Sequence, residues 1–193
     1  MMPETQQAQF RRIRSHLVRE ILKQNLRTFL PCRLVVNAYL ALATRSLIHP
    51  LARIDWNVRI GRRCFIGNST LNTLGGHGSI EIGEGTIVYS GCELICHYDS
   101  HIRIGRNVLF TRQAAALTGG HAYSDRQTPI LSQGTTAADV IVEDDCWIGY
   151  RAILCPGAIV RRGTVIAAGA VVTKEIPPMV VAGGVPAKVI GDR

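Results

Sequence analysis

A strict six-residue repeat runs through the C-terminal half of this chain of 193 residues. Aliphatic residues return at every sixth position from Val142 to Val172, and small side chains follow four places behind them from Cys146 to Ala170. An α-helix needs apolar residues at i, i+3, i+4 and i+7, and a strand alternates, so neither produces this period. A β-solenoid does, if each hexapeptide forms one side of a triangular coil.

Three hexapeptides then close one coil, and the coils stack at the ~4.8 Å spacing of hydrogen-bonded strands. The aliphatic residue of each hexapeptide points inward and meets its equivalent one coil away. The predicted stacks are Val142 on Val160, Ile148 on Ile166 and Leu154 on Val172.

The same phase continues upstream, so we expect an all-β solenoid of about five coils. Its upstream aliphatic positions are Ile54, Ile60 and Ile66, then Ile82, Val88 and Leu94, then Ile104, Phe110 and Ala116. The repeat is interrupted at Asn72 to Glu81, at Ser100 to Arg103 and, over the longest stretch, at about 117–139. Glycines such as Gly157 and Gly163 suit the tight corners.

Charge divides the chain into two regions. Residues 1–50 hold 8 Lys and Arg against 2 Asp and Glu, whereas residues 51–193 hold 14 against 12. We therefore predict a basic arm over 1–50 and a hexapeptide-repeat domain over 51–193, with a short C-terminal extension after the last repeat.

The arm has apolar residues at helical spacing from Phe10 to Leu30, with Arg and Lys between them, and Pro31 is expected to end this helix. A second helix is predicted over Leu34 to Leu47. The arm could cover the open end of the solenoid. A basic amphipathic segment, residues 8–47, could also contact an anionic membrane peripherally, and the two roles are compatible. No nucleic-acid recognition motif accompanies the charge.

The sequence favours a cytoplasmic protein, with peripheral contact at the inner face of the membrane as an addition. The apolar run from Leu34 to Ala43 is too short to span a bilayer, and no convincing signal peptide precedes it. Cys64, Cys92 and Cys146 occupy small corner positions, and the six cysteines lack the spacing of a zinc ribbon, so reduced thiols are expected.

The regular coils bring no reactive group, so function is expected at the longest interruption. His121 follows a glycine pair there, and histidine is the residue type whose ordinary pKa lies near neutrality, which suits a group that accepts and returns a proton. Asp125, four residues later, could orient the imidazole. The competing interpretation of His121 is a solvated loop residue.

The motifs that follow carry a specific resemblance. The chain reads GGHAYSD, TPILSQG, DDCWIG, VVTKEIPP and AGGVPAKVI over about 75 residues. This pattern resembles the hexapeptide-repeat acyltransferases, which fold as left-handed parallel β-helices. It is most similar to bacterial O-acetyltransferases that modify lipopolysaccharide, capsule and exopolysaccharide sugars, and to maltose and galactoside acetyltransferases.

The resemblance implies an acetyl-CoA-dependent O-acetyltransferase acting on a sugar or glycan hydroxyl. His121 would be the general base, and Gly149 would lie near the developing oxyanion. Trp147 would lie along acetyl-CoA close to its sulfur. The remaining implied acetyl-CoA contacts are Ala167, Ala168, Thr173, Lys174 and Lys188. No metal is expected.

Simpler roles compete with these. Trp147 could only cap its coil, and Lys174 and Lys188 could be solvated charges. Arg161 and Arg162 could contact phosphates or only decorate the surface.

Family members are generally homotrimers with the site between subunits. The second histidine typical of enzymes acting on free maltose or galactosides has no counterpart here, which favours a glycan precursor as acceptor.

Two rival functions use the same architecture. A γ-class carbonic anhydrase would bind zinc through histidines, and the chain offers His77, His97, His101 and His121. The spacing of His97 and His101 departs by one residue from that family's pair. A non-catalytic solenoid that serves as an assembly module would bind no acetyl-CoA.

Overall fold

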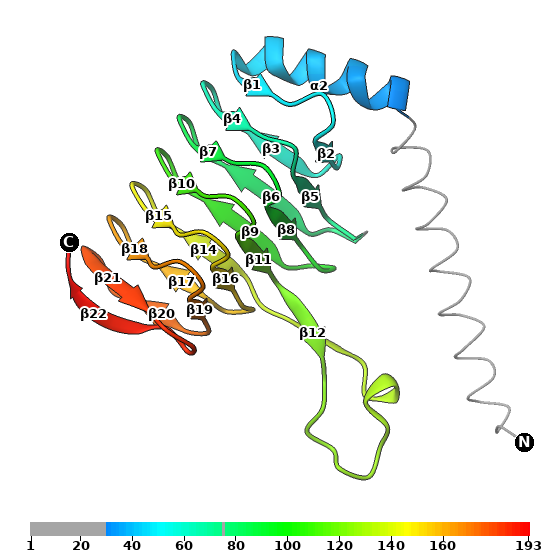
Figure 1. Cartoon of the computed structure of the whole chain (residues 1–193). Coiled ribbons are helices and arrows are strands. Elements are labelled where there is room, and N and C mark those ends of the chain that lie inside the picture. Colours follow the sequence, from blue (N-terminus) through cyan, green and yellow to red (C-terminus); the bar gives the residue numbers. More distant parts are fainter. Residues whose placement is uncertain (1–29, 75) are drawn as a thin grey trace, which may run out of the picture.

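The chain folds as a three-walled prism of short parallel strands, closed at one end by a helix (Figure 1). The computed structural model describes residues 30–74 and 76–193. The predicted arm helix from Phe10 lies almost entirely outside the described residues.

Each wall is a ladder of strands taken from successive coils. Wall A contains β1 (Leu47–Ile48), β4 (Phe65–Ile66), β7 (Ile87–Val88), β10 (Leu109–Phe110), β15 (Trp147–Ile148), β18 (Val165–Ile166) and β21 (Val180–Gly183), with β22 (Lys188–Asp192) antiparallel at its edge. Wall B contains β2 (Arg53–Ile54), β5 (Thr70–Asn72), β8 (Glu93–Ile95), β11 (Ala115–Leu117), β16 (Ile153–Leu154) and β19 (Val171–Val172). Wall C contains β3 (Val58–Ile60), β6 (Ser79–Ile82), β9 (His101–Ile104), β14 (Val140–Val142), β17 (Ile159–Val160) and β20 (Glu175–Ile176).

The core is the inward aliphatic series that the six-residue period predicted. All three predicted stacks are confirmed: Val142 pairs with Val160, Ile148 with Ile166 and Leu154 with Val172. Their side chains are fully or almost fully buried. Because successive residues of a strand face opposite sides, this register is strongly specified by burial.

The prism contains more coils than the sequence analysis predicted. Within the described residues six coils run from β1–β3 to β18–β20, and β21 adds one further strand. The extra coil begins at Leu47–Ile48, before residue 51. Ile48 stands six places before Ile54 and is in phase with the repeat, but the adjoining helical pattern obscured it.

One predicted interruption was wrong in position. His101 to Arg103 of this stretch belong to β9 (His101–Ile104), in which Ile102 is fully buried and pairs with Val140. The extra residues lie just before it, around Tyr98, which adopts a left-handed φ of 44°. They are accommodated at a corner, where an insertion leaves the ladder intact.

The helix that closes the prism also differs from its predicted bounds. α2 spans Leu30–Thr44 instead of Leu34 to Leu47, and Leu47 opens β1. Pro31 lies in the first turn of α2, where its missing N–H would have had no intrahelical partner, so it starts this helix. No helix among the described residues has the length and apolar character needed to span a bilayer.

All six cysteines lie within the described residues, and each is a free thiol. Cys64, Cys92 and Cys146 are buried at corners, as their small size predicted. Burial raises the pKa of Cys92 to about 11, against weaker opposing hydrogen bonds, so this thiol is unreactive.

Candidate active site

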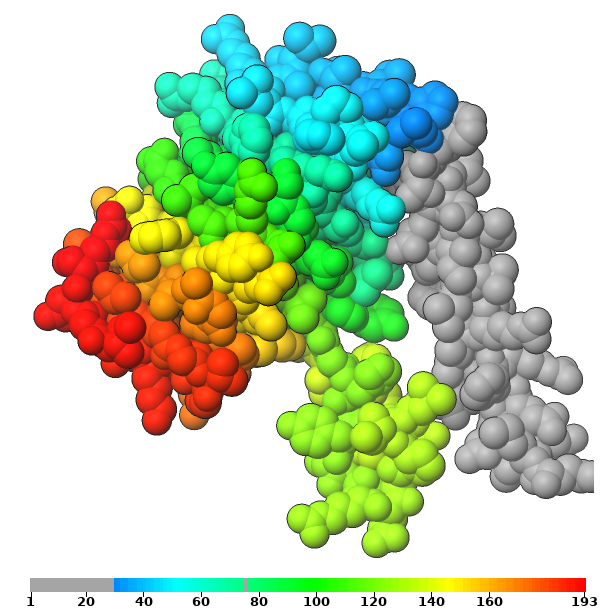
Figure 2. All heavy atoms as spheres, in the orientation of Figure 1, coloured from blue at the N-terminus to red at the C-terminus, as the bar shows by residue number. Residues whose placement is uncertain are grey.

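The longest interruption of the repeat is a hairpin that stands away from the prism (Figure 2). It leaves the corner between walls B and C after β11 and consists of β12 (Gly119–His121), a 3₁₀ turn (Ile130–Ser132) and β13 (Thr135–Ala137). In the antiparallel ladder His121 lies opposite Thr135. The predicted catalytic loop is therefore an ordered projection whose root lies at the B/C corner.

Hydrogen bonds fix the root of the hairpin to the coil before it. The Thr118 hydroxyl accepts the backbone N–H of His97 at 2.7 Å, and the Ala138 N–H donates to the Thr118 carbonyl at 2.8 Å. The Asp139 carboxylate accepts the His101 N–H at 2.8 Å and pairs with Arg103 at 2.9 Å. Both strands of the hairpin thus start from rigid points on the prism.

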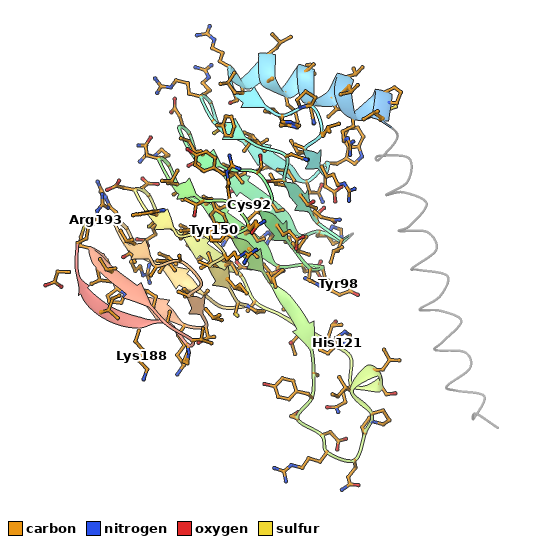
Figure 3. All side chains as sticks on the ribbon, viewed as in Figure 1. Cys92, Tyr98, His121, Tyr150, Lys188 and Arg193 are labelled. Atoms are coloured by element: carbon orange, nitrogen blue, oxygen red, sulfur yellow. The ribbon has the colours of Figure 1, made fainter. Side chains whose placement is uncertain are left out.

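His121 is exposed on the first of these strands, close to the root (Figure 3). Asp125 does not act as its orienting partner in this structure. The Asp125 carboxylate accepts the Gln127 N–H at 2.8 Å and the Thr128 hydroxyl. These bonds, the one to Thr128 first, lower the pKa of Asp125 and use it to shape its own turn.

Sequence reasoning missed His97 as a neighbour of His121. The His97 ring packs against Gly119, because a Cβ on Gly119 would overlap it. Burial lowers the pKa of His97, and the charge of His121 contributes in the same direction. The only available signal was the glycine pair before His121, since Gly119 is what makes room for the ring.

A second group of predicted residues gathers at the corner between walls A and B. Gly149 lies directly beneath Ala167 and Ala168, because a Cβ on Gly149 would come within 2.7 Å of both backbones. The Gly149 N–H donates to the Ile166 carbonyl at 2.8 Å. This amide is therefore committed to the ladder, and oxyanion binding by the Gly149 N–H itself would break a coil-to-coil hydrogen bond.

Trp147 and Lys188 lie beside this A/B corner. Trp147 points outward from β15, with 48% of its surface exposed, between Leu109 and Val165 of the same wall. Lys188 is exposed on β22 opposite Gly183, and a Cβ on Gly183 would touch Ala167. The A/B corner thus combines an aromatic face, exposed backbone and a cation.

Thr173 and Lys174 lie instead at the B/C corner, between β19 and β20, and both are exposed. They share that corner with the root of the hairpin. The predicted residues therefore fall into two groups on opposite edges of wall B: His121, Thr173 and Lys174 on one edge, and Trp147, Gly149, Ala167, Ala168 and Lys188 on the other. One chain does not bring them together.

Arg161 has a structural role. Its guanidinium pairs with Glu143 and Glu175, each at 2.7 Å, across three strands of wall C. These carboxylates raise the pKa of Arg161, and Glu143 also accepts the backbone N–H of Arg162. The Arg161 charge is therefore already balanced.

Among the hollows on the surface of the described residues, two differ in size and in their place relative to the predicted site. The smaller, about 260 Å³, lies at the A/B corner and is lined by Tyr89, Thr111, Arg112 and Tyr150. The larger, about 470 Å³, lies on wall C between Arg59 and Arg103, away from the predicted residues. Only the smaller one adjoins a predicted group.

Within the described parts of the chain, no group of three or more His, Cys, Asp or Glu side chains could hold a metal ion. The four histidines of the carbonic anhydrase hypothesis do not converge on one point, although His97 lies near His121. His97 packs on Gly119, and His101 shares a 3.0 Å hydrogen bond with the Ser79 hydroxyl.

Comparison with known proteins agrees with this architecture. The family described as the hexapeptide repeat of succinyl-transferase matches residues 139–174. A galactoside O-acetyltransferase of Lactococcus lactis is 32% identical over 130 residues, which cover 67% of this chain and 60% of that protein. The chain spans about half the length of the curated relatives it matches.

Solved structures show the same fold. The polySia-specific acetyltransferase NeuO has a TM-score of 0.57 and 26% identity, covering 70% of this chain and 61% of NeuO. A galactoside acetyltransferase in complex with coenzyme A has a TM-score of 0.54 and 22% identity, covering 84% and 82%. The prism is the left-handed parallel β-helix of this class of protein. The chain belongs to the hexapeptide-repeat acetyltransferase family.

Proposed function

We propose that the protein transfers an acetyl group from acetyl-CoA to a sugar hydroxyl, and that the acceptor is a precursor of a surface polysaccharide or exopolysaccharide. The names of its relatives support acetyl transfer to sugars. The polysaccharide precursor is favoured because the second histidine of the free-galactoside and maltose enzymes is absent after His121.

His121 acts as general base in this proposal. Its neutral imidazole takes the proton of the sugar hydroxyl while the hydroxyl oxygen attacks the thioester carbonyl carbon of acetyl-CoA. The carbon–sulfur bond then breaks, and the imidazolium returns the proton to the leaving sulfur. The oxygen–carbon bond replaces the carbon–sulfur bond, and the histidine ends neutral, so no acetylated enzyme is required.

The observation that carries the proposal is the division of the predicted residues between two edges of wall B. Hexapeptide enzymes of this class are expected to form trimers, and a trimer repeats one head-to-tail interface three times. The B/C edge of one subunit, with His121, would then face the A/B edge of the next. Each site would be complete only between two subunits.

The A/B corner suits acetyl-CoA chemically. Gly149, Ala167 and Ala168 have no bulky side chains, so an extended pantetheine arm could reach their backbone. Trp147 offers an exposed apolar surface beside it. Lys188 and, from the other edge, Lys174 supply the cations that phosphates require.

The first test is His121→Ala in the full-length protein. Turnover should fall by roughly 10²- to 10⁴-fold, the usual worth of general-base catalysis, while acetyl-CoA still raises the melting temperature. His77→Ala is the matched control, because His77 is also exposed near a B/C corner but lies outside the site. Undiminished turnover of His121→Ala would remove it from the mechanism.

The second test asks whether sites are shared. Ala168 is exposed, so Ala168→Trp should block the A/B corner without disturbing the core. His121→Ala and Ala168→Trp trimers are each expected to be inactive. After mixed refolding of equal amounts, about one site in three of each hybrid trimer, or about a quarter of all sites, should join two intact halves and regain activity. If the mixture stays inactive although hybrids form, both halves belong to one subunit.

We place the reaction in the cytoplasm. Reduced cysteines favour that compartment. Fractionation of cells producing the full chain would test this placement.

A further inference from the structure

The helix that closes the prism is oriented with its polar residues inward. Arg33, Asn37 and Thr44 lie on the side that meets the first coil, and Asn37 is only 2% exposed. The Asn37 amide nitrogen lies 3.0–3.1 Å from the carbonyl oxygens of His49, Pro50 and Ala52. This polar side chain holds α2 against the chain turn that begins the prism.

The opposite face of α2 contains no charged residue. Its exposed members are Leu30, Pro31, Cys32, Leu34, Val35, Ala38, Tyr39, Leu42 and Ala43. Val35, Tyr39 and Leu42 are 70%, 69% and 82% exposed, and they follow one another along one side of the helix. A helix on a soluble protein normally shows the reverse arrangement. A continuous apolar face of this kind marks an interaction surface.

Charge around this end of the molecule indicates what the surface contacts. Residues 30–63, which form α2 and the start of the prism, contain six arginines and one aspartate. Residues 64–193 contain 10 Lys and Arg against 11 Asp and Glu. Arg45, Arg53 and Arg62 are exposed close to the helix. Arg59 and Arg63 pair with Glu81 and Glu84 of the next coil, so Arg45, Arg53 and Arg62 carry exposed positive charge that has no ion pair among the described residues at this end of the prism.

We propose that α2 docks the protein on an anionic lipid surface, with its outward face in the headgroup layer and the neighbouring arginines against lipid phosphates. Membrane-surface helices combine an apolar face with basic residues in this way. Tyr39 and Trp56, exposed at the same end, are residue types enriched at membrane interfaces. Cover by a second copy or by residues 1–29 would bury the apolar face but leave the positive charge unmatched.

Docking in this orientation has a geometric consequence. α2 lies across one end of the prism, and the hairpin leaves the prism several coils away (Figure 1). The coils stack away from the surface on which α2 lies. An acceptor carried on a membrane lipid would be held near the lipid surface on which α2 lies. This statement about the acceptor rests on the proposed function, whereas the docking of α2 does not.

Flotation of the full-length protein with vesicles tests the docking. Vesicles of phosphatidylglycerol and phosphatidylcholine should bind it, and binding should fall in high salt or with phosphatidylcholine alone. Val35→Ser with Leu42→Ser should lower the partition coefficient about tenfold or more. Val185→Ser, at a 73% exposed position outside this end, is the matched control.

Three outcomes would overturn the proposal. The full chain could remain unbound by anionic vesicles, or the Val35→Ser, Leu42→Ser variant could bind as well as the parent. The third is loss of a larger oligomer in that variant without any vesicle binding, which would identify a second copy as the occupant. Thermal melting of the variant confirms that α2 is intact, because both substitutions are at exposed positions.

A separate observation concerns His97, and it extends the proposed function. Gly119 and His121 are two residues apart on β12, so both positions face the same side of the strand. The His97 ring lies against Gly119 on that face. Its Nδ1 is buried and makes no hydrogen bond of normal geometry among the described residues, although the Ile95 backbone lies close enough to act on the pKa of the ring. A buried polar atom without such a bond calls for an explanation.

We infer that His97 is a positioning residue, whose ring fixes the orientation of the His121 imidazole through packing and a hydrogen bond made when substrate is bound. Its ring belongs to the preceding coil, which is rigid, whereas His121 belongs to the projecting hairpin. The prism would thus set the direction of the base through a side chain from outside the hairpin.

Two variants of His97 separate this role from simple packing. His97→Phe keeps the ring but removes both nitrogens, and kcat should fall roughly 10- to 100-fold, the cost of a small misplacement of a catalytic group, with KM for acetyl-CoA unchanged. His97→Asn keeps a polar atom near the place of Nδ1 and should restore most of kcat. Full activity of His97→Phe, or equal losses in both variants, would overturn the inference. Failure of the proposed function would appear separately, as an active His121→Ala variant.

Discussion

The walls of the prism and the hairpin at residues 118–139 are opposite kinds of structure in one chain. Wall residues such as Phe110, Ile148 and Ile166 are completely buried and paired on both sides with equivalent residues of adjacent coils. The hairpin is mostly exposed and is fixed chiefly at Thr118 and Asp139. The comparison teaches that the residues that stabilise the prism and the proposed base His121 lie in separate parts of the chain, so each part can be altered to test the other.

The largest effect is expected in the walls. Ile148→Ala should lower the free energy of unfolding by about 2–5 kcal/mol, because it leaves a cavity between Phe110 and Ile166. Ile153→Ala, at the outward position of β16 and 37% exposed, should cost much less. Urea unfolding followed by circular dichroism measures both. Similar losses at the two positions would mean that the walls are not specified by their inward series.

Excision of the hairpin sharpens the comparison from the other side. Replacing residues 119–137 by a two-residue glycine turn removes both strands of the hairpin and His121 but keeps Thr118 and Asp139, so the free energy of unfolding should change by about 1 kcal/mol or less. Acetyl transfer should be lost if the hairpin carries the base. Thermal melting and a thiol-release assay report the two properties. A large fall in melting temperature would show that the hairpin also supports the prism.

The smallest effect concerns an ion pair on wall C. Hydrogen bonds from Arg161 lower the pKa of Glu143 below its ordinary 4.5, so the folded state binds fewer protons than the unfolded state. The stability that this shift contributes is fully present above the ordinary pKa of 4.5 and is lost as the pH falls through the lowered pKa of Glu143. Glu143→Gln should therefore reduce the difference in melting temperature between pH 7 and pH 3. Glu93→Gln, an exposed carboxylate of wall B, is the control. Because Glu143 is at the surface, the effect is small.

The prism could be predicted well from the sequence because its information is local and repeated. Each inward aliphatic residue specifies the same environment, and three predicted stacks were confirmed. The errors occurred where the repeat adjoins a helical pattern or inserted residues. Ile48 was in phase but adjoined a helical pattern, and the extra residues near Tyr98 lay one corner earlier than the strand to which they were assigned.

The candidate site was less predictable. His121 could be selected from its residue type and its place after a glycine pair, whereas the ring of His97 against Gly119 depends on contacts between coils. The interpretation of Asp125 as an orienting group was wrong, because its carboxylate closes a local turn by accepting hydrogen bonds from Gln127 and Thr128. Likewise, the bond from the Gly149 N–H to Ile166 follows from the stacking of coils.

The sequence by itself determined a six-residue period, the inward residues that build the prism and the place where the period stops, because each depends on local spacing. Only the tertiary structure decided which residues share an edge of wall B and which face of α2 meets solvent. Those relations depend on the rotation from one wall to the next and on a single buried asparagine, and neither is encoded in the spacing of nearby residues.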